Sequence, residues 1–161
     1  MYLTQPQAIQ AAFHSDTVER KTLFLTPAQI QKIEQLARVK MDSSIVSYYV
    51  ARNSSGVAGT AFFDRRVVRT MPVTYMTVVK PSGVVDHVDI LAFDEPVDYL
   101  PPARWLALFK NRPLDNNLAI GHAIPRITGS SLSSQAINDG VRLMLAIYQV
   151  AVRDSVEGTS K

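Results

Sequence analysis

The feature that most constrains the fold is a series of four β-rich runs joined by short turns. The runs cover about residues 45–50, 59–63, 73–79 and 84–91, and β-branched and aromatic side chains dominate them. Asn53-Ser54-Ser55-Gly56 and Lys80-Pro81-Ser82-Gly83 supply turn residues between them. Connections this short join neighbouring antiparallel strands, so the sequence predicts an antiparallel meander.

Helices are predicted before and after this strand region in the sequence. Thr4-Gln5-Pro6-Gln7 and Thr26-Pro27-Ala28-Gln29 both have the T-x-x-Q pattern of a capping box, so helices should begin there, the second covering about 27–39. A short helix should follow Pro101-Pro102. The last helix should begin near Ser133 or Ser134 and run to about Arg153, with a broad apolar stripe and one narrow polar face. That polar face comprises Gln135, Asn138, Asp139, Arg142, Gln149 and Arg153.

Gly140 lies in the middle of this last helix. Glycine costs about 1 kcal/mol relative to alanine at such a position, so we expect a strand or side chain to approach closely there. The patterns together predict one α+β domain over 1–161, a twisted antiparallel sheet packed by helices, with a long C-terminal helix. Its core should cover about 44–153, and an N-terminal helical part about 4–39.

The composition excludes several classes of protein. A chain of 161 residues with 47% hydrophobic and 19% charged residues is typical of a globular domain, and the absence of cysteine excludes disulfides and thiolate metal ligands. The basic residues are dispersed, and the densest group, Arg65, Arg66 and Arg69, is typical of a solvated strand end, so no nucleic-acid partner is expected. A helix needs about 20 apolar residues to cross a bilayer, and the apolar runs of this chain are too short or too interrupted, so we expect no membrane span.

The segment Ile127-Thr128-Gly129-Ser130-Ser131-Leu132-Ser133-Ser134 places five hydroxyl side chains and a glycine before the last helix. A helix N-terminus presents unpaired N–H groups and a partial positive charge, so this cluster could hold a phosphate. The alternative is structural: Ser133 or Ser134 would be an ordinary N-cap and Thr128-Gly129-Ser130 a turn. Spacing alone leaves both interpretations open.

The same residues resemble the S-G-A-T-x-[ST]-S segment of the FMN-binding domain family. The resemblance rests on Thr128 to Ser134, followed by Ala136-Ile137 and Gly140-Val141-Arg142, and the order of upstream parts over about 44–150 is also similar. That family includes the FMN-carrying subunits of the sodium-pumping NADH:quinone reductase and Rnf electron-transport complexes. The resemblance implies a flavoprotein that transfers electrons.

In that family the FMN phosphate is esterified to the threonine of the motif by a flavin transferase. Matched residue by residue, Thr128, Gly129, Ser130 and Ser131 take the places of serine, glycine, alanine and the acceptor threonine. Leu132 and Ser133 would supply contacts at the helix entry, and Glu95, before Pro96, matches an acidic residue near the flavin. The alternative for Glu95-Pro96 is a simple turn that ends a strand. The chain departs from the pattern in having serine as acceptor and Pro125 where an acidic residue is frequent.

The resemblance also implies a cellular setting. The family's carrier domains work outside the cytoplasmic membrane, in membrane-associated redox complexes, so the domain is expected to be periplasmic or exported, with its signal or anchor absent from this chain. Expected partners are redox proteins and a flavin transferase. The alternative is a flavin-free docking or scaffold domain of an exported redox assembly.

Other kinds of site are less consistent with the sequence. Ser130 or Ser131 as a hydrolase nucleophile lacks the G-x-S-x-G context and a recognisable His and acid order, so an electron carrier is favoured over an enzyme with its own substrate. The three histidines, at 14, 87 and 122, lack the spacing of a helical metal site, so no metal is expected. Trp105 could stack on a flavin, but a tryptophan in an apolar helix more often lies in the core, which is the position we expect. Thr74-Tyr75-Met76 could line the ring, and sheet core is the default expectation for them.

Overall fold

The computed structural model describes residues 4–13, 17–68, 71–93, 101–127 and 131–153. The elements run in the order α1 (Gln5–Phe13), β1 (Thr17–Phe24), α2 (Pro27–Ala37), β2 (Ile45–Asn53), β3 (Gly56–Val68), β4 (Met71–Val79) and β5 (Val85–Phe93). These are followed by a short α3 (Ala103–Leu106), the 3-10 turn η2 (Ala107–Phe109), the long α4 (Ser131–Ile147) and its π-helical end η3 (Tyr148–Val152).

The five strands form one antiparallel sheet in the order β1-β2-β3-β4-β5. The predicted meander and the predicted α+β class are confirmed. The predicted N-terminal helical part over 4–39 is wrong for residues 17–24, which form β1. Its sequence T-V-E-R-K-T-L-F has three charged residues at its centre, a composition that edge strands tolerate because one side of them faces solvent.

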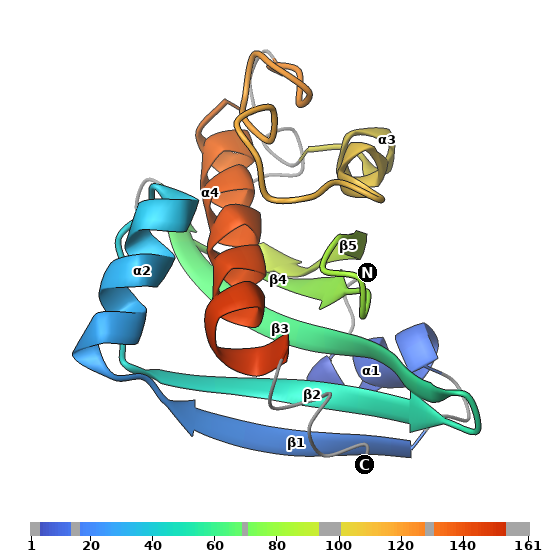
Figure 1. Ribbon diagram of the computed structural model, residues 1–161. Helices are drawn as coiled ribbons and strands as arrows, with labels where there is room; N and C mark the ends of the chain where they lie inside the picture. The colour runs from blue at the N-terminus through green and yellow to red at the C-terminus, as the bar shows by residue number, and fades with distance from the viewer. Residues whose placement is uncertain (1–3, 14–16, 69–70, 94–100, 128–130, 154–161) are drawn as a thin grey trace.

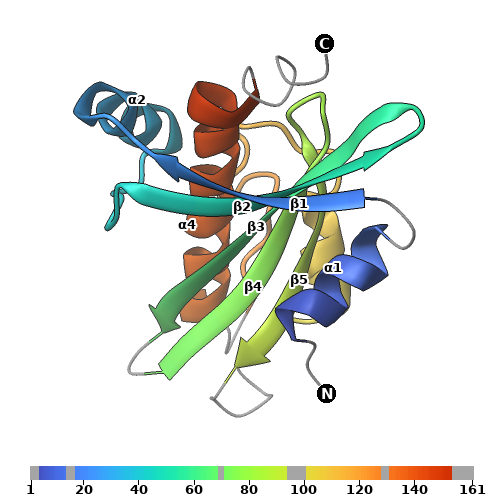
Figure 2. The ribbon, with the colours of Figure 1, turned by 90° about the horizontal axis from the view of Figure 1, so that it is seen from below.

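Helices cover both faces of the sheet, which twists strongly from β1 to β5 (Figure 1). α4 and α2 lie on one face, and α1 lies on the opposite face, as the view from below shows (Figure 2). The main core lies between the sheet and α4 and includes Phe62, Tyr75, Ile137 and Leu145. A smaller core lies under α1, around Phe13 and neighbouring strand residues.

Both predicted capping boxes are present. The Thr26 side chain accepts a hydrogen bond from the Gln29 backbone N–H at 3.1 Å, and the Gln29 side chain accepts one from the Thr26 N–H at 2.9 Å. Thr4 and Gln7 form the same reciprocal pair at 3.3 and 2.9 Å. Each pair satisfies N–H groups that a helix start otherwise leaves without partners, which is why α1 and α2 begin where they do.

Gly140 is the point where α4 approaches the sheet. A Cβ at Gly140 would overlap the hydroxyl of Tyr75 on β4, and would lie 2.9 Å from a carboxylate oxygen of Asp64 on β3. The Tyr75 hydroxyl donates a 2.6 Å hydrogen bond to that carboxylate. The close approach predicted from the glycine is therefore confirmed, and its partner is a buried tyrosine.

The predicted polar face of the last helix is not uniformly solvent-exposed. Gln135 and Gln149 are exposed, but Asn138 and Arg142 are buried. They are buried because α2 and the segment after residue 115 lie against this side of α4 and offer backbone carbonyls to both side chains.

Candidate functional site

The N-terminus of α4 is the part of the structure on which the predicted site falls. The helix begins at Ser131, two to three residues earlier than the sequence indicated. Ser133 and Ser134 therefore lie in its first turn rather than at its cap, and both are buried, at 2% and 0% exposure. Leu132, between Ser131 and Ser133, is 56% exposed. The first turn of α4 thus has one exposed apolar side chain and two buried hydroxyl groups.

Two buried polar atoms near this helix start have no hydrogen-bond partner among the described residues. They are the hydroxyl oxygen of Ser134 and the side-chain carbonyl oxygen of Asn138. Residues four apart lie on the same face of a helix, so the two atoms follow one another along one side of α4. Buried polar atoms are normally paired, and no described residue pairs these two.

The chain that leads into the motif is anchored by Trp105. Its indole N–H donates a 2.9 Å hydrogen bond to the carbonyl of Pro125, three residues before Thr128. The ring is 2% exposed and packs edge-on against Phe109, with ring centroids 5.1 Å apart. Its predicted place in the core is confirmed, and it also fixes the backbone just before the motif.

Arg142, about three turns farther along α4, holds the segment that follows residue 115. Its guanidinium donates to the carbonyls of Asp115 and Leu118 at 2.7 and 2.9 Å, and to those of Leu36 and Ala37 at the end of α2 at 3.2 and 2.8 Å. Burial, and then the nearby charge of Arg38, lower the pKa of Arg142 from its ordinary value. This one side chain ties α4 to both α2 and the segment that follows residue 115.

A small polar pocket of about 170 Å³ adjoins this cross-brace. The end of α2, the segment 116–119 and the side of α4 that carries Asn138 and Arg142 form it together. Gln135 and Asp139 stand at its rim, where the Gln135 amide donates to the Asp139 carboxylate at 2.8 Å. Its residues on α4, from Gln135 to Arg142, therefore lie about one to three helical turns from Ser131.

Several predicted site residues lie outside the described part of the chain. They are Thr128, Gly129, Ser130 and Glu95. Of the remaining predicted residues, Ser131, Leu132 and Ser133 stand together in the first turn of α4. The contribution of this site to cofactor binding stays a prediction.

The described residues contain no cluster of side chains that could bind a metal ion. No group of three or more metal-ligating side chains comes together among them. His87 lies between two carboxylates of its own strand, with nitrogen–oxygen distances of 3.3 Å to Asp86 and 3.5 Å to Asp89. His122 is exposed, and His14 lies outside the described residues.

Sequence reasoning missed three contributors to this region. Asn138 and Arg142 were assigned to a solvent-facing stripe, and the bond from Trp105 to Pro125 was not anticipated. Nothing in the sequence distinguished Asn138 and Arg142 from the other members of the polar face of this helix. Their partners lie 20 or more residues away in the chain, so spacing could not identify them.

No helix in the described part of the chain is long and apolar enough to cross a membrane. No protein-family model matches the sequence, and no curated protein matches it.

A match appears among solved structures. The crystal structure of Shewanella oneidensis NqrC aligns with a TM-score of 0.63 and 12% sequence identity, covering 97% of this chain and 91% of that chain. At this identity the likeness concerns the fold, and it extends over nearly the whole length of both chains. The chain therefore has the fold of NqrC, which confirms at the level of the fold the resemblance indicated by the motif before α4.

Proposed function

We propose that this protein is an FMN-binding electron carrier that holds the flavin phosphate at the N-terminus of α4. The observation that carries the proposal is the position of the motif: in a chain with the fold of NqrC, α4 begins at Ser131, the residue matched to the family's flavin acceptor. A helix start supplies N–H donors and a favourable potential for an anion. The motif therefore lies at a helix N-terminus, which is a favourable place for a phosphate.

The residues present fit a phosphate-bearing group. Thr128, Gly129, Ser130 and Ser131 would surround the phosphate, and Leu132 and Ser133 would contact the same end of the cofactor. The oxygen atoms of Ser134 and Asn138, which have no hydrogen-bond partner among the described residues, would provide further polar contacts on that side of α4. The hydroxyl of Ser134 can donate to an oxygen of the ligand, whereas the Asn138 carbonyl accepts only from a ligand donor.

The protein contributes position and environment rather than its own acid or base. Bound flavin accepts and releases one or two electrons, and the chain has to fix its orientation and limit its contact with water. Trp105 holds the backbone before the motif, and Arg142, about three turns farther along, ties α4 to α2 and to the segment after residue 115. These contacts position the helix that carries the site, which is the part that a carrier protein has to supply.

We further propose that Ser131 is the covalent acceptor. A serine hydroxyl can form the same phosphoester as the family's threonine, and a flavin transferase would be the partner that makes the bond. Glu95 would lie near the flavin. In keeping with the family, the domain would act outside the cytoplasm, facing redox partner proteins of a membrane-associated complex.

FMN titration tests this proposal with a pair of substitutions at Leu132. Leu132→Asp places a carboxylate in the first turn, which favours the helix but repels a phosphate. We expect FMN binding at least about fivefold to tenfold weaker than for Leu132→Asn, since two unit charges about 4 Å apart repel by about 1 kcal/mol even in bulk water. Unfolding measurements should show Leu132→Asp to be no less stable than Leu132→Asn.

The titration also separates the carrier from a flavin-free scaffold. Wild-type protein that binds no FMN, and remains colourless when co-expressed with a flavin transferase, would identify the scaffold. Equal FMN affinity of the two Leu132 variants would place the phosphate away from the start of α4.

A further inference from the structure

The two edge strands of the sheet, β1 and β5, differ in how far their outer sides are hydrogen-bonded. The β5 edge is partly covered, because the N–H of Asn111 donates to the Val85 carbonyl at 2.7 Å and the N–H of Val85 donates to the Arg112 carbonyl at 3.1 Å. β1, at the other edge, pairs along all eight residues with β2 and with no other strand among the described residues (Figure 1). Its outer side is therefore a row of backbone hydrogen-bonding groups that no other described strand covers.

The backbone register shows which groups of β1 face outward. The Leu25 N–H donates to the Ser44 carbonyl at 2.8 Å, continuing the ladder between β1 and β2. Because bonding direction alternates along an antiparallel strand, Leu23, Lys21 and Glu19 also face β2. The backbone N–H and C=O groups of residues 18, 20, 22 and 24 consequently point away from the sheet.

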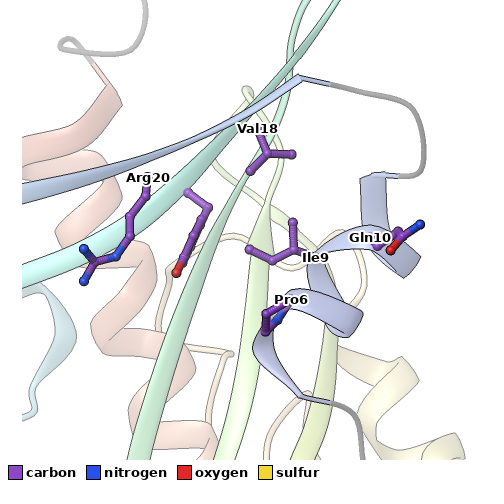
Figure 3. A pocket seen from close by; sticks show the side chains of 6 residues that line it. Pro6, Ile9, Gln10, Val18 and Arg20 are labelled. Atoms are coloured by element: carbon purple, nitrogen blue, oxygen red, sulfur yellow. The ribbon is translucent and has the colours of Figure 1, made fainter.

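A groove of about 400 Å³ runs beside this edge, between β1 and α1. Its walls are formed by Pro6, Ile9 and Gln10 of α1 and by Val18, Arg20 and Tyr49 of the sheet. Ile9 and Val18 point toward one another across it, while Arg20 lies farther along β1 (Figure 3). The groove is thus apolar at its centre and has a guanidinium at one end.

The charges of β1 are divided between its two faces. Glu19 and Lys21 form an ion pair at 3.5 Å on the face away from the groove. Arg20, on the groove face, donates to the Ser47 hydroxyl at 3.3 Å and meets no carboxylate among the described residues. The groove face therefore has an uncompensated positive charge next to an apolar wall.

We propose that the β1 edge is a docking site for an extended segment of a partner protein, which adds to the sheet as a further strand. Backbone hydrogen bonds to residues 18, 20 and 22 would supply affinity, as in other cases of strand addition. Side chains of adjacent strands on one face lie opposite each other. The bound segment therefore carries an apolar residue opposite Val18 and, two positions along, an acidic residue opposite Arg20.

The test uses a labelled peptide, Ser-Val-Thr-Glu-Thr-Val-Ser, which offers this pattern in both strand directions. Fluorescence anisotropy should show saturable binding to the wild-type protein. Thr22→Pro removes one outward N–H and leaves the ladder to β2 intact, because proline is tolerated where the missing donor faces solvent. We expect roughly tenfold weaker binding, the effect of one or two lost hydrogen bonds. Thr22→Ala, which keeps the N–H, is the matched control and should bind like wild type.

Charge reversal provides a second, independent arm. Arg20→Glu should bind the peptide weakly and should bind a peptide with lysine in place of glutamate more tightly than wild type does. Circular dichroism verifies that each variant is folded. The proposal is overturned if wild type shows no saturable binding or if Thr22→Pro binds like Thr22→Ala. It is also overturned if sedimentation shows a wild-type dimer that Thr22→Pro abolishes, since that result assigns the edge to a second copy.

Discussion

The hydroxyl of Tyr75 occupies the space that a Cβ at Gly140 would need. The glycine in the middle of α4 therefore allows a buried tyrosine of β4 to extend past the helix and reach Asp64 of β3, to which it donates at 2.6 Å. This contact fixes how closely α4 lies against the sheet, and α4 carries the proposed phosphate site at its first turn.

Gly140→Ala should destabilise the protein, although alanine is the better helix former. The added methyl group meets the Tyr75 hydroxyl and the Asp64 carboxylate, so we expect a loss of about 1–3 kcal/mol in the free energy of unfolding, the usual cost of overpacking. Urea unfolding provides the measurement. In a Tyr75→Phe background the same substitution should cost less, because the overlapping oxygen is gone. A stabilised Gly140→Ala would show that α4 does not approach β4 this closely.

The pH dependence of stability should reveal the buried Tyr75. Burial, and then the negative charge of Asp64, raise the pKa of Tyr75 well above 10.0. The unfolded chain consequently releases this proton first as pH rises, so the stabilisation is intact below about pH 10 and declines above it. The free energy of unfolding should decrease more between about pH 8 and about pH 11 for the wild type than for Tyr75→Phe. Parallel losses in both proteins would rule out a raised pKa at Tyr75.

Arg142→Met should be among the more damaging single substitutions. It removes donors to four backbone carbonyls, and we expect a loss of about 3 kcal/mol or more because bonds from a charged donor are strong and the carbonyls are left unpaired. Arg142→Lys, which keeps the charge but not the planar fork, should lose less. The exposed Arg104→Met is the control and should change stability by no more than about 0.5 kcal/mol. Thermal or urea unfolding would contradict the cross-brace if Arg142→Met matched the control.

Thr26→Ala tests whether the second capping box stabilises the protein. Both hydrogen bonds of the pair with Gln29 depend on the geometry of this cap, and loss of the threonine side chain should cost about 1 kcal/mol. Thr26→Ser retains the hydroxyl and should cost clearly less. Equal unfolding free energies for the alanine and serine variants would show that the hydroxyl is not the source of stability.

Local chemistry was sufficient to predict much of the fold. The turn residues around Gly56 and the capping patterns at Thr4 and Thr26 act within four residues, and the corresponding hairpin and helices are present. Gly140 indicated a close approach without identifying Tyr75, because the tyrosine comes from a strand 65 positions earlier in the numbering. Contacts of that kind depend on the assembled fold.

The errors have physical causes as well. β1 was missed because its central charges obscure the alternation of an edge strand. Asn138 and Arg142 were assigned to solvent because polar residues on an amphipathic helix usually face it. Here the carbonyl of Ala37, 105 residues away, and that of Leu118 provide buried acceptors. For the candidate site, the helix start at Ser131 was predicted to within two or three residues, and the residues just before it stay a sequence-based expectation.

The most direct test of the central claim is the intact mass, after denaturation, of protein co-expressed with a flavin transferase. Only covalently bound flavin survives denaturation, so the wild type should carry the added mass of a phosphoester-linked FMN. Ser131→Ala should carry none, Ser131→Thr should be labelled at least as fully as wild type, and Ser133→Ala, which keeps the acceptor, should stay labelled. Full labelling of Ser131→Ala would contradict the assignment of the flavin to the start of α4.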